Sequence, residues 1–248
     1  MGDSRLESNQ AKIAELKERV STAIRVLGRL GMADWLGHAS ARVPGTDLFV
    51  TSPKGAKRGN VQSFRAQDIL VMDLEDHVVD GAAPPPGEFY IHSAIYRRRP
   101  DVMGVIHDHQ QMTVLFGIAR REIRPLHLMS ASVVKEPIPV YDSPHAISTP
   151  ERGRAIAETI GTHCACHMRG HGVVVVGNSV ENAAMNAIHL ERQAQWNYLA
   201  CQLGDPAVIA AAAIPLEEVE EFAEFQNPAR GGGGGTGAWA YFTSLLES

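Results

Sequence analysis

Apolar positions recur along most of the chain with spacings that predict alternating helices and strands. Between about residues 8 and 30 they recur at three- and four-residue steps, the pattern of a helix with one buried face. The same spacing predicts helices over residues 88–99, 110–118, 151–161 and 181–203. Short runs rich in β-branched residues, bounded by turn-forming residues, predict strands over residues 37–42, 48–51, 69–73, 102–110 and 168–177. The alternation indicates an α/β fold, and because no Gly-x-Gly-x-x-Gly fingerprint follows a predicted strand we expect no nicotinamide site.

The periodic pattern ends near residue 225, and the composition then changes. Residues 227–237 read Asn-Pro-Ala-Arg-Gly-Gly-Gly-Gly-Gly-Thr-Gly, the composition of a flexible linker. The segment after it contains Trp239, Tyr241, Phe242 and Leu245, and is apolar enough to dock on this subunit or on a neighbour. We therefore expect one domain over residues 1–225, followed over residues 226–248 by a glycine-rich linker and a docking tail.

Composition and charge narrow the class of protein. With 248 residues, 44% of them hydrophobic, the chain can bury a sizeable core. A net charge of -5 without a long basic run argues against binding to nucleic acid or to an anionic membrane. The three cysteines are too few for a disulfide framework, and Cys164-x-Cys166 lacks the spacing of a zinc knuckle. No apolar run approaches the ~20 residues of a membrane span, and no signal peptide is visible, so we expect a soluble cytoplasmic protein.

The strand predicted over residues 102–110 ends in His107-Asp-His109. Alternate side chains of a strand lie on one face, about 7 Å apart along the backbone, so both imidazoles could reach one metal ion at about 2.0–2.1 Å. On this motif alone, the alternative of two solvated histidines at a strand end stays open.

Further candidate ligands lie on both sides of this motif. Glu88 follows a proline-rich connector and opens a predicted helix, where a carboxylate could also cap the helix. His171 lies between two glycines, which allow the backbone to approach a bound group closely. A carboxylate and three histidines suit a divalent transition metal, namely zinc, manganese, iron or cobalt. His92, one turn after Glu88, is better interpreted as a buried, hydrogen-bonded helix residue.

A loop over residues 52–59 combines glycine with positive charge and includes Lys54. Backbone N–H groups and lysine or arginine side chains in such a loop can hold an anion. A flexible surface loop would have the same composition, so both interpretations stay open.

Taken together, the motifs resemble one known family. They are Gly37-His-Ala-Ser-Ala-Arg42, Pro86-Gly-Glu88-x-x-x-His92, Arg99-Pro-Asp-Val102, His107-x-His109 and Arg169-Gly-His171-Gly172. Over about residues 10–205 the chain resembles the class II aldolase/adducin family. The resemblance implies a three-layer α/β/α fold with a central, mostly antiparallel sheet, and a homotetramer with active sites at subunit interfaces. It also implies that His107, His109 and His171 bind the metal and that Glu88 is the catalytic acid/base, in some members also a metal ligand.

Two departures from the sugar-phosphate aldolases of this family bear on the substrate. His38 stands where those enzymes have asparagine, and Pro86-Gly87 stand where they have phosphate-holding serines. His38 and Arg42 instead resemble a decarboxylase subgroup that acts on dihydroxyphthalate and hydroxymethylpyridine dicarboxylate. We therefore expect metal-dependent decarboxylation of a hydroxylated aromatic or heteroaromatic carboxylate. Four residues are expected to approach the substrate: His38, Arg42, Lys54 and His127.

Three other functions are compatible with the resemblance. The first is an aldolase that cleaves a non-phosphorylated hydroxy-acid or sugar. The second is an iron-dependent oxygenase on the same fold, because histidine-rich sites also hold iron. The third is an adducin-like interaction module, which is disfavoured because the adducin head lacks the metal histidines and this chain has all three.

Overall fold

An eight-stranded sheet forms the centre of the molecule in the computed structural model, which describes residues 2–55, 60–226 and 234–247. The strand order is β4-β3-β2-β1-β5-β8-β7-β6, and every neighbouring pair is antiparallel except β6 with β7. The strands are β1 (His38–Arg42), β2 (Leu48–Thr51), β3 (Leu70–Asp73), β4 (Val78–Asp80), β5 (Gly104–Asp108), β6 (Val140–Tyr141), β7 (Ala165–Met168) and β8 (Gly172–Gly177).

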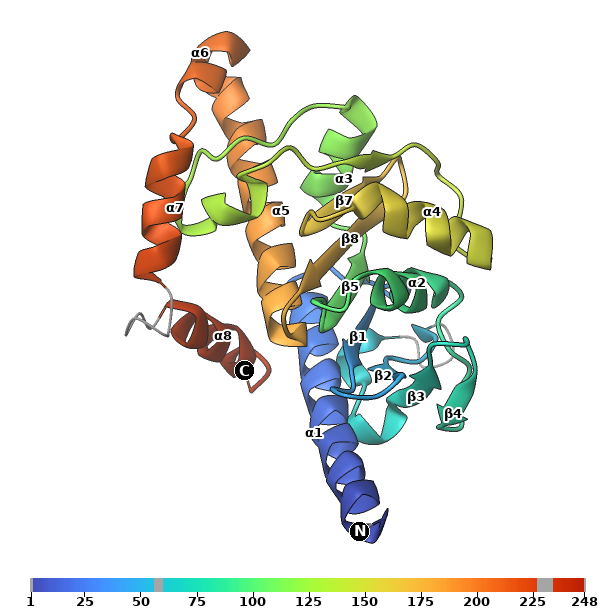
Figure 1. The fold of residues 1–248 in the computed structure, drawn as a ribbon. Helices are drawn as coiled ribbons and strands as arrows, with labels where there is room; N and C mark the ends of the chain where they lie inside the picture. Colours follow the sequence, from blue (N-terminus) through green and yellow to red (C-terminus); the bar gives the residue numbers. More distant parts are fainter. Residues whose placement is uncertain (1, 56–59, 227–233, 248) are drawn as a thin grey trace.

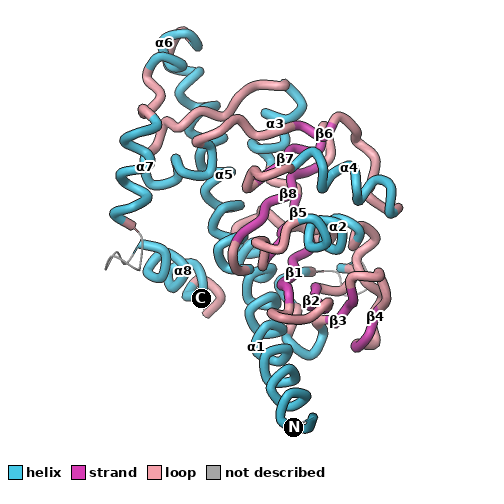
Figure 2. Tube along the Cα trace, in the orientation of Figure 1, coloured by secondary structure: helices cyan, strands magenta, loops and turns pink. Residues whose placement is uncertain are grey.

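Helices cover both faces of the sheet (Figures 1 and 2). On one face α1 (Gly2–Arg29) and α5 (Val180–Leu203) enclose a core that includes Ile106, while α2 (Tyr90–Arg98) and α4 (Pro150–Ile160) enclose a second core that includes Val105. Neighbouring strand residues enter opposite cores because side chains alternate across a sheet. The expected α/β fold with a mostly antiparallel sheet between helices is thereby confirmed.

The remaining helices lie around this centre. They are α3 (Gln111–Ala119), α6 (Pro206–Ala211), α7 (Leu216–Phe225), α8 (Gly234–Ser244) and the 3₁₀ helices η2 (Val61–Ser63), η3 (Ala66–Asp68) and η4 (Leu128–Val134). None of the described helices is long and apolar enough to cross a membrane.

The strand predicted over residues 168–177 was expected to be interrupted at Gly170-His-Gly172, and the structure shows that this interruption is a turn between two separate strands. The structure has two strands, β7 and β8, joined by a tight turn at Arg169–His171. Gly170 has a φ of +69°, a conformation that favours glycine and that reverses the chain direction here. His171 therefore lies in a hairpin turn at the edge of β8 rather than within a strand.

The C-terminal segment docks on its own subunit. Phe242 of α8 is buried in the core that α1 and α5 share, and the guanidinium of Arg192 lies over its ring, 5.0 Å from the centroid. Residues 227–233 of the predicted linker lie outside the described residues. The division into a domain and a docking tail stays a prediction.

Candidate metal centre and active site

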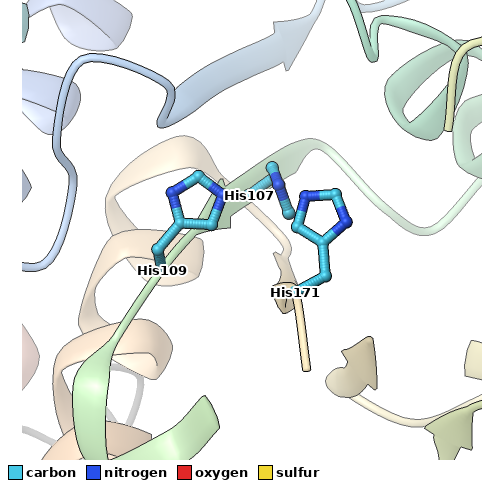
Figure 3. A group of neighbouring side chains, drawn as sticks. All are labelled: His107, His109 and His171. Atoms are coloured by element: carbon cyan, nitrogen blue, oxygen red, sulfur yellow. The ribbon is translucent and has the colours of Figure 1, made fainter. Parts of the chain in front are cut away.

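Three histidines converge at one end of the two central strands (Figure 3). His107 belongs to β5, His109 follows that strand directly, and His171 precedes the neighbouring strand β8. Their ring centroids lie 5.0 Å (His107 to His109), 5.2 Å (His107 to His171) and 5.6 Å (His109 to His171) apart. One nitrogen from each ring lies within 4.8 Å of the others, so a single ion could bind all three.

Hydrogen bonds orient two of these rings as metal ligands require. The Nδ1 of His107 lies 3.0 Å from the carbonyl oxygen of Val173, and because a carbonyl only accepts, this nitrogen carries the proton. The buried Nε2 of His107 is left with a lone pair and no hydrogen-bond partner among the described residues. The Nδ1 of His109 lies 3.3 Å from Asp34 Oδ1. Metal-binding histidines usually donate their second N–H to such an oxygen, so the residues present fit a metal ion.

Gly172 allows the backbone of the β7–β8 hairpin to pass close to the rings. A Cβ atom at this position would lie 2.8 Å from His107 Cε1, 3.0 Å from His109 Cδ2 and 2.7 Å from the carbonyl oxygen of Asp108. Real Cβ atoms essentially never approach below 3.0 Å, so a side chain here would push the hairpin, and His171 with it, away from β5.

Glu88 completes the cluster from the turn before α2. Its Oε2 lies 3.5 Å from His107 Nε2 and 3.4 Å from His171 Nε2, and its Oε1 accepts a 2.7 Å hydrogen bond from the N–H of Ile147. The carboxylate thus binds a distant amide instead of capping its own helix. Burial would raise the pKa of Glu88, but the rings of His107 and His171 outweigh it and hold the pKa well below its usual value. The hydrogen bond with Glu88 in turn raises the pKa of His171.

His38 lies against this cluster from β1. It pairs with His107 across the β1–β5 ladder, is 2% exposed, and offers a nitrogen within 4.8 Å of ligand atoms of Glu88 and His107. His92 of α2 is fully buried and hydrogen-bonded to His38, which agrees with its interpretation as a buried helix residue. Both metal-compatible groups found among the described residues include His107, and neither includes Cys164 or Cys166.

The other expected substrate-binding residues are not brought to the cluster. Arg42 lies at the far end of β1, where its guanidinium donates to the carbonyl oxygens of Val102, Tyr96 and Arg99. His127 stacks on Trp196 of α5 and lines a separate cavity of about 820 Å³ that α5, α7 and α8 also border.

The backbone of Lys54 lies near the segment that leads to the cluster, but its side chain does not point to a defined partner among the described residues. Its backbone N–H donates to the carbonyl oxygen of Pro84, which puts the loop beside the connector that leads to Glu88, but its side chain is exposed. Residues 56–59 of this loop lie outside the described residues, so the anion-binding interpretation stays a prediction.

We expect Arg42 to support the fold. Arg42→Ala removes the guanidinium donor from the carbonyl oxygens of Val102, Tyr96 and Arg99, of which the last keeps the N–H of Val102, and it removes a cation–π contact with the Tyr96 ring, at 4.8 Å from its centroid. The free energy of unfolding in urea should fall by about 1.5–3 kcal/mol, the usual worth of a charged hydrogen bond, with bound metal unchanged. Arg98→Ala, at an exposed position in the same helix as Tyr96, is the control. Parent-like stability combined with weakened substrate binding would instead make Arg42 a substrate ligand.

Sequence reasoning missed several residues that shape the site. They are Asp34, which contacts His109, the Ile147 amide, which binds Glu88, and the Ser40 and Tyr96 hydroxyls, which lie behind His92. Ser40 had a visible signal, because it lies two positions after His38 in a predicted strand and so shares its face. Asp34 and Ile147 lie in irregular segments whose partners depend on the tertiary fold.

Comparisons with known proteins agree with this architecture. Residues 18–198 match the family described as Class II Aldolase and Adducin N-terminal domain. The 3,4-dihydroxyphthalate decarboxylase of Arthrobacter keyseri is 28% identical over 188 residues, which cover 72% of this chain and 75% of that protein. The L-ribulose-5-phosphate 4-epimerase of Salmonella paratyphi C (strain RKS4594) is 28% identical over 200 residues, or 75% of this chain and 85% of the epimerase. The solved L-fuculose 1-phosphate aldolase from Glaciozyma antarctica PI12 has the same fold, with a TM-score of 0.76 at 22% identity over 96% of this chain and 91% of that one.

Proposed function

The chain belongs to the class II aldolase and adducin family, and from that premise we propose that it is a metal-dependent decarboxylase. Its substrate is a hydroxylated aromatic or heteroaromatic carboxylate, and its metal is a divalent zinc, manganese, iron or cobalt ion. The observation that carries the proposal is the convergence of Glu88 with His107, His109 and His171 in one half-buried cluster. Decarboxylases of 3,4-dihydroxyphthalate among the relatives support the choice of reaction.

The residues beside Glu88 favour a carboxylate over a phosphorylated substrate. Pro86 and Gly87 offer no side-chain hydroxyl, and proline also lacks a backbone N–H donor. His38 supplies a buried ring nitrogen with no partner among the described residues, close to Glu88 and His107. One such donor suits a planar carboxylate or a ring oxygen better than a phosphate, which usually needs several donors.

Glu88 has the protonation state that the reaction needs at its start. With its pKa held low, it is an ionised acceptor that can take the proton of the substrate's ring hydroxyl. The bond from the ring to the carboxylate then breaks, carbon dioxide leaves, and the electron pair stays on the ring carbon. Glu88, now protonated, delivers its proton to that carbon, and the ring oxygen regains a proton from solvent. A bound divalent metal supplies Lewis acidity that stabilises the negative charge on substrate oxygen.

A substrate screen tests the proposed reaction. Purified protein loaded with zinc, manganese, cobalt or, without oxygen, iron should release carbon dioxide from ortho-hydroxy aromatic acids, 3,4-dihydroxyphthalate among them. The same samples should be assayed for cleavage of sugar phosphates and of non-phosphorylated hydroxy-acids. Carbon dioxide release that disappears with a chelator and returns with metal supports decarboxylation. Cleavage of an aldol substrate with no carbon dioxide release would replace it with the aldolase alternative.

The aldolase alternative is retained because the relatives include an epimerase of a sugar phosphate. Breaking a carbon–carbon bond next to a carbonyl leaves an enolate, which a bound divalent ion would stabilise, while one carboxylate would transfer the proton. His38 in place of asparagine and the absence of serines before Glu88 favour a non-phosphorylated substrate for this alternative as well.

For the assembly we propose a homotetramer with the active sites at subunit interfaces. Large apolar side chains are exposed on α3 and on the C-terminal half of α5, among them Leu115, Ile118, Trp196, Leu199 and Leu203. Exposed apolar groups in such number are typical of surfaces that another chain covers. A cytoplasmic location and the absence of nucleic-acid and membrane partners remain part of the proposal.

A further inference from the structure

A chain of buried polar groups runs from the metal cluster into the core between the sheet and α2. The Nδ1 of His38 lies 2.6 Å from His92 Nε2, and the Nδ1 of His92 lies 2.6 Å from Ser40 Oγ. Ser40 Oγ lies 2.7 Å from the hydroxyl oxygen of Tyr96. All four side chains are at most 2% exposed, so water does not replace these bonds.

Each contact in this series needs one atom that gives a proton and one that gives a lone pair, so a histidine that accepts in it is a neutral imidazole. A neutral imidazole has one nitrogen that donates and one that accepts. The position of one proton in this series of hydrogen bonds therefore determines the position of all the others.

Tyr96 determines which atom donates and which accepts in each of these hydrogen bonds. Burial raises its pKa, so the hydroxyl keeps its proton, and Ser40 Oγ is the one side-chain acceptor within reach among the described residues. In the opposite direction the Tyr96 proton would be buried without an acceptor, which is costly. Tyr96 thus donates to Ser40, and Ser40 to His92 Nδ1.

The positions of the protons on His92 and His38 follow from this direction. His92 carries its proton on Nε2 and donates it to His38 Nδ1. His38 must then carry its own proton on Nε2, the buried atom without a partner that faces Glu88 and His107. We propose that Tyr96, Ser40 and His92 are positioning residues that fix His38 as an Nε2–H hydrogen-bond donor to an anionic oxygen of the substrate, and that His38 is therefore not a metal ligand.

The proton on His38 Nε2 distinguishes the two groups of candidate metal ligands, which distance alone does not. In both groups, His38 with Glu88 and His107, and His107 with His109 and His171, the candidate ligand atoms lie within 4.8 Å of one another. A protonated ring nitrogen has no lone pair to give to an ion, so His38 cannot serve as a ligand in the first group, whereas the second group can supply three imidazole ligands. The donor role rests on the proposed function, whereas the position of the proton does not.

Nitrogen-15 NMR of the histidine rings tests the position of the proton directly. In the zinc-loaded protein, labelled only in histidine and assigned by comparison with His38→Gln, His38 should show a protonated Nε2 and an unprotonated Nδ1. Ser40→Ala removes the donor to His92 and should move both His38 signals towards values averaged over the two tautomers. Ser93→Ala is the matched control, because Ser93 is equally buried beside His92 but contacts Arg97. A parent protein with His38 protonated on Nδ1 would overturn the inference.

Metal content and kinetics supply independent readouts. His38→Gln and His38→Leu should bind as much zinc as the parent, and a fall in zinc content in both would overturn the inference by making His38 a ligand. On the acid that the parent decarboxylates, His38→Leu should lower kcat/KM on the order of 10- to 100-fold, the worth of one hydrogen bond to a charged group, and His38→Gln should recover part of it through its amide N–H. A parent without decarboxylase activity would refute the proposed function, while the NMR and zinc results would still decide the place of the proton.

Discussion

His109→Ala should lose the bound metal and the enzymatic activity together. The substitution leaves His107 and His171 as the remaining imidazole ligands and leaves the Asp34 carboxylate without the ring that it contacts. Loss of an outer partner of a metal ligand typically costs about 10–100-fold in metal affinity, so loss of the ligand itself should cost more. Elemental analysis of the purified variant, with activity measured on the same sample, gives both quantities.

A graded series makes this result specific. Asp34→Asn keeps the His109 ring but weakens its orientation, and should give a metal affinity between those of the parent and His109→Ala. His77→Ala is the control, because His77 is exposed beside Asp73 at the turn between β3 and β4 and should retain full metal content. Full occupancy in His109→Ala would remove His109 from the set of ligands.

Glu88→Gln should fold and bind metal almost like the parent, yet turn over far more slowly. Glutamine keeps the shape of the side chain and can still accept the hydrogen bond from Ile147, but it cannot take up and release a proton. General acid–base catalysis typically contributes about 10²–10⁴-fold, and kcat should fall by that factor. The thermal transition should change little, because the Ile147 contact is retained.

Metal content must be measured on the same Glu88→Gln sample, because a carboxylate that also binds the ion would lower activity simply by losing it. Ile147→Ala is a useful comparison, since it keeps the backbone amide that binds Glu88 while changing the packing around it. A metal-replete Glu88→Gln enzyme with the parent rate would exclude Glu88 from proton transfer and direct attention to His38.

The sequence predicts which residues form the cluster better than it predicts the turn and the strand pairing that bring them together. His107 and His109 could be predicted to lie side by side because alternate residues of a strand point to the same face. Glu88 and His171 were suggested by the residues around them. The glycines on both sides of His171 indicate an interruption of the strand, but the four valines that follow fit one bent strand as well as a hairpin, so the turn at Gly170 could not be predicted. The alignment of β1 with β5, which sets His38 beside His107, depends on contacts between segments that are far apart in the sequence, and local patterns do not predict it.

Arg42 and His127 show where local sequence information ends. Arg42 lies in the same short motif as His38, but a strand carries its side chain several residues further from the cluster, to backbone carbonyls at the opposite end. His127 lies in an irregular segment whose position depends on contacts with Gln193 and Trp196 of α5. Neither placement follows from periodicity or composition.

The pairing of β5 with β8 also bears on how a newly made chain acquires its metal. His107 and the hairpin residue Val173, which accepts its N–H, are 66 residues apart in the sequence, and His171 lies in the same hairpin. A ribosome that has released His107 and His109 has therefore made a two-nitrogen site whose rings are not yet held in place. We expect the complete three-histidine site to form only when β8 has been synthesised and has paired with β5, since an unfolded chain rarely preforms a metal site. Metal loading is therefore expected to follow the folding of the hairpin rather than to begin on the growing chain.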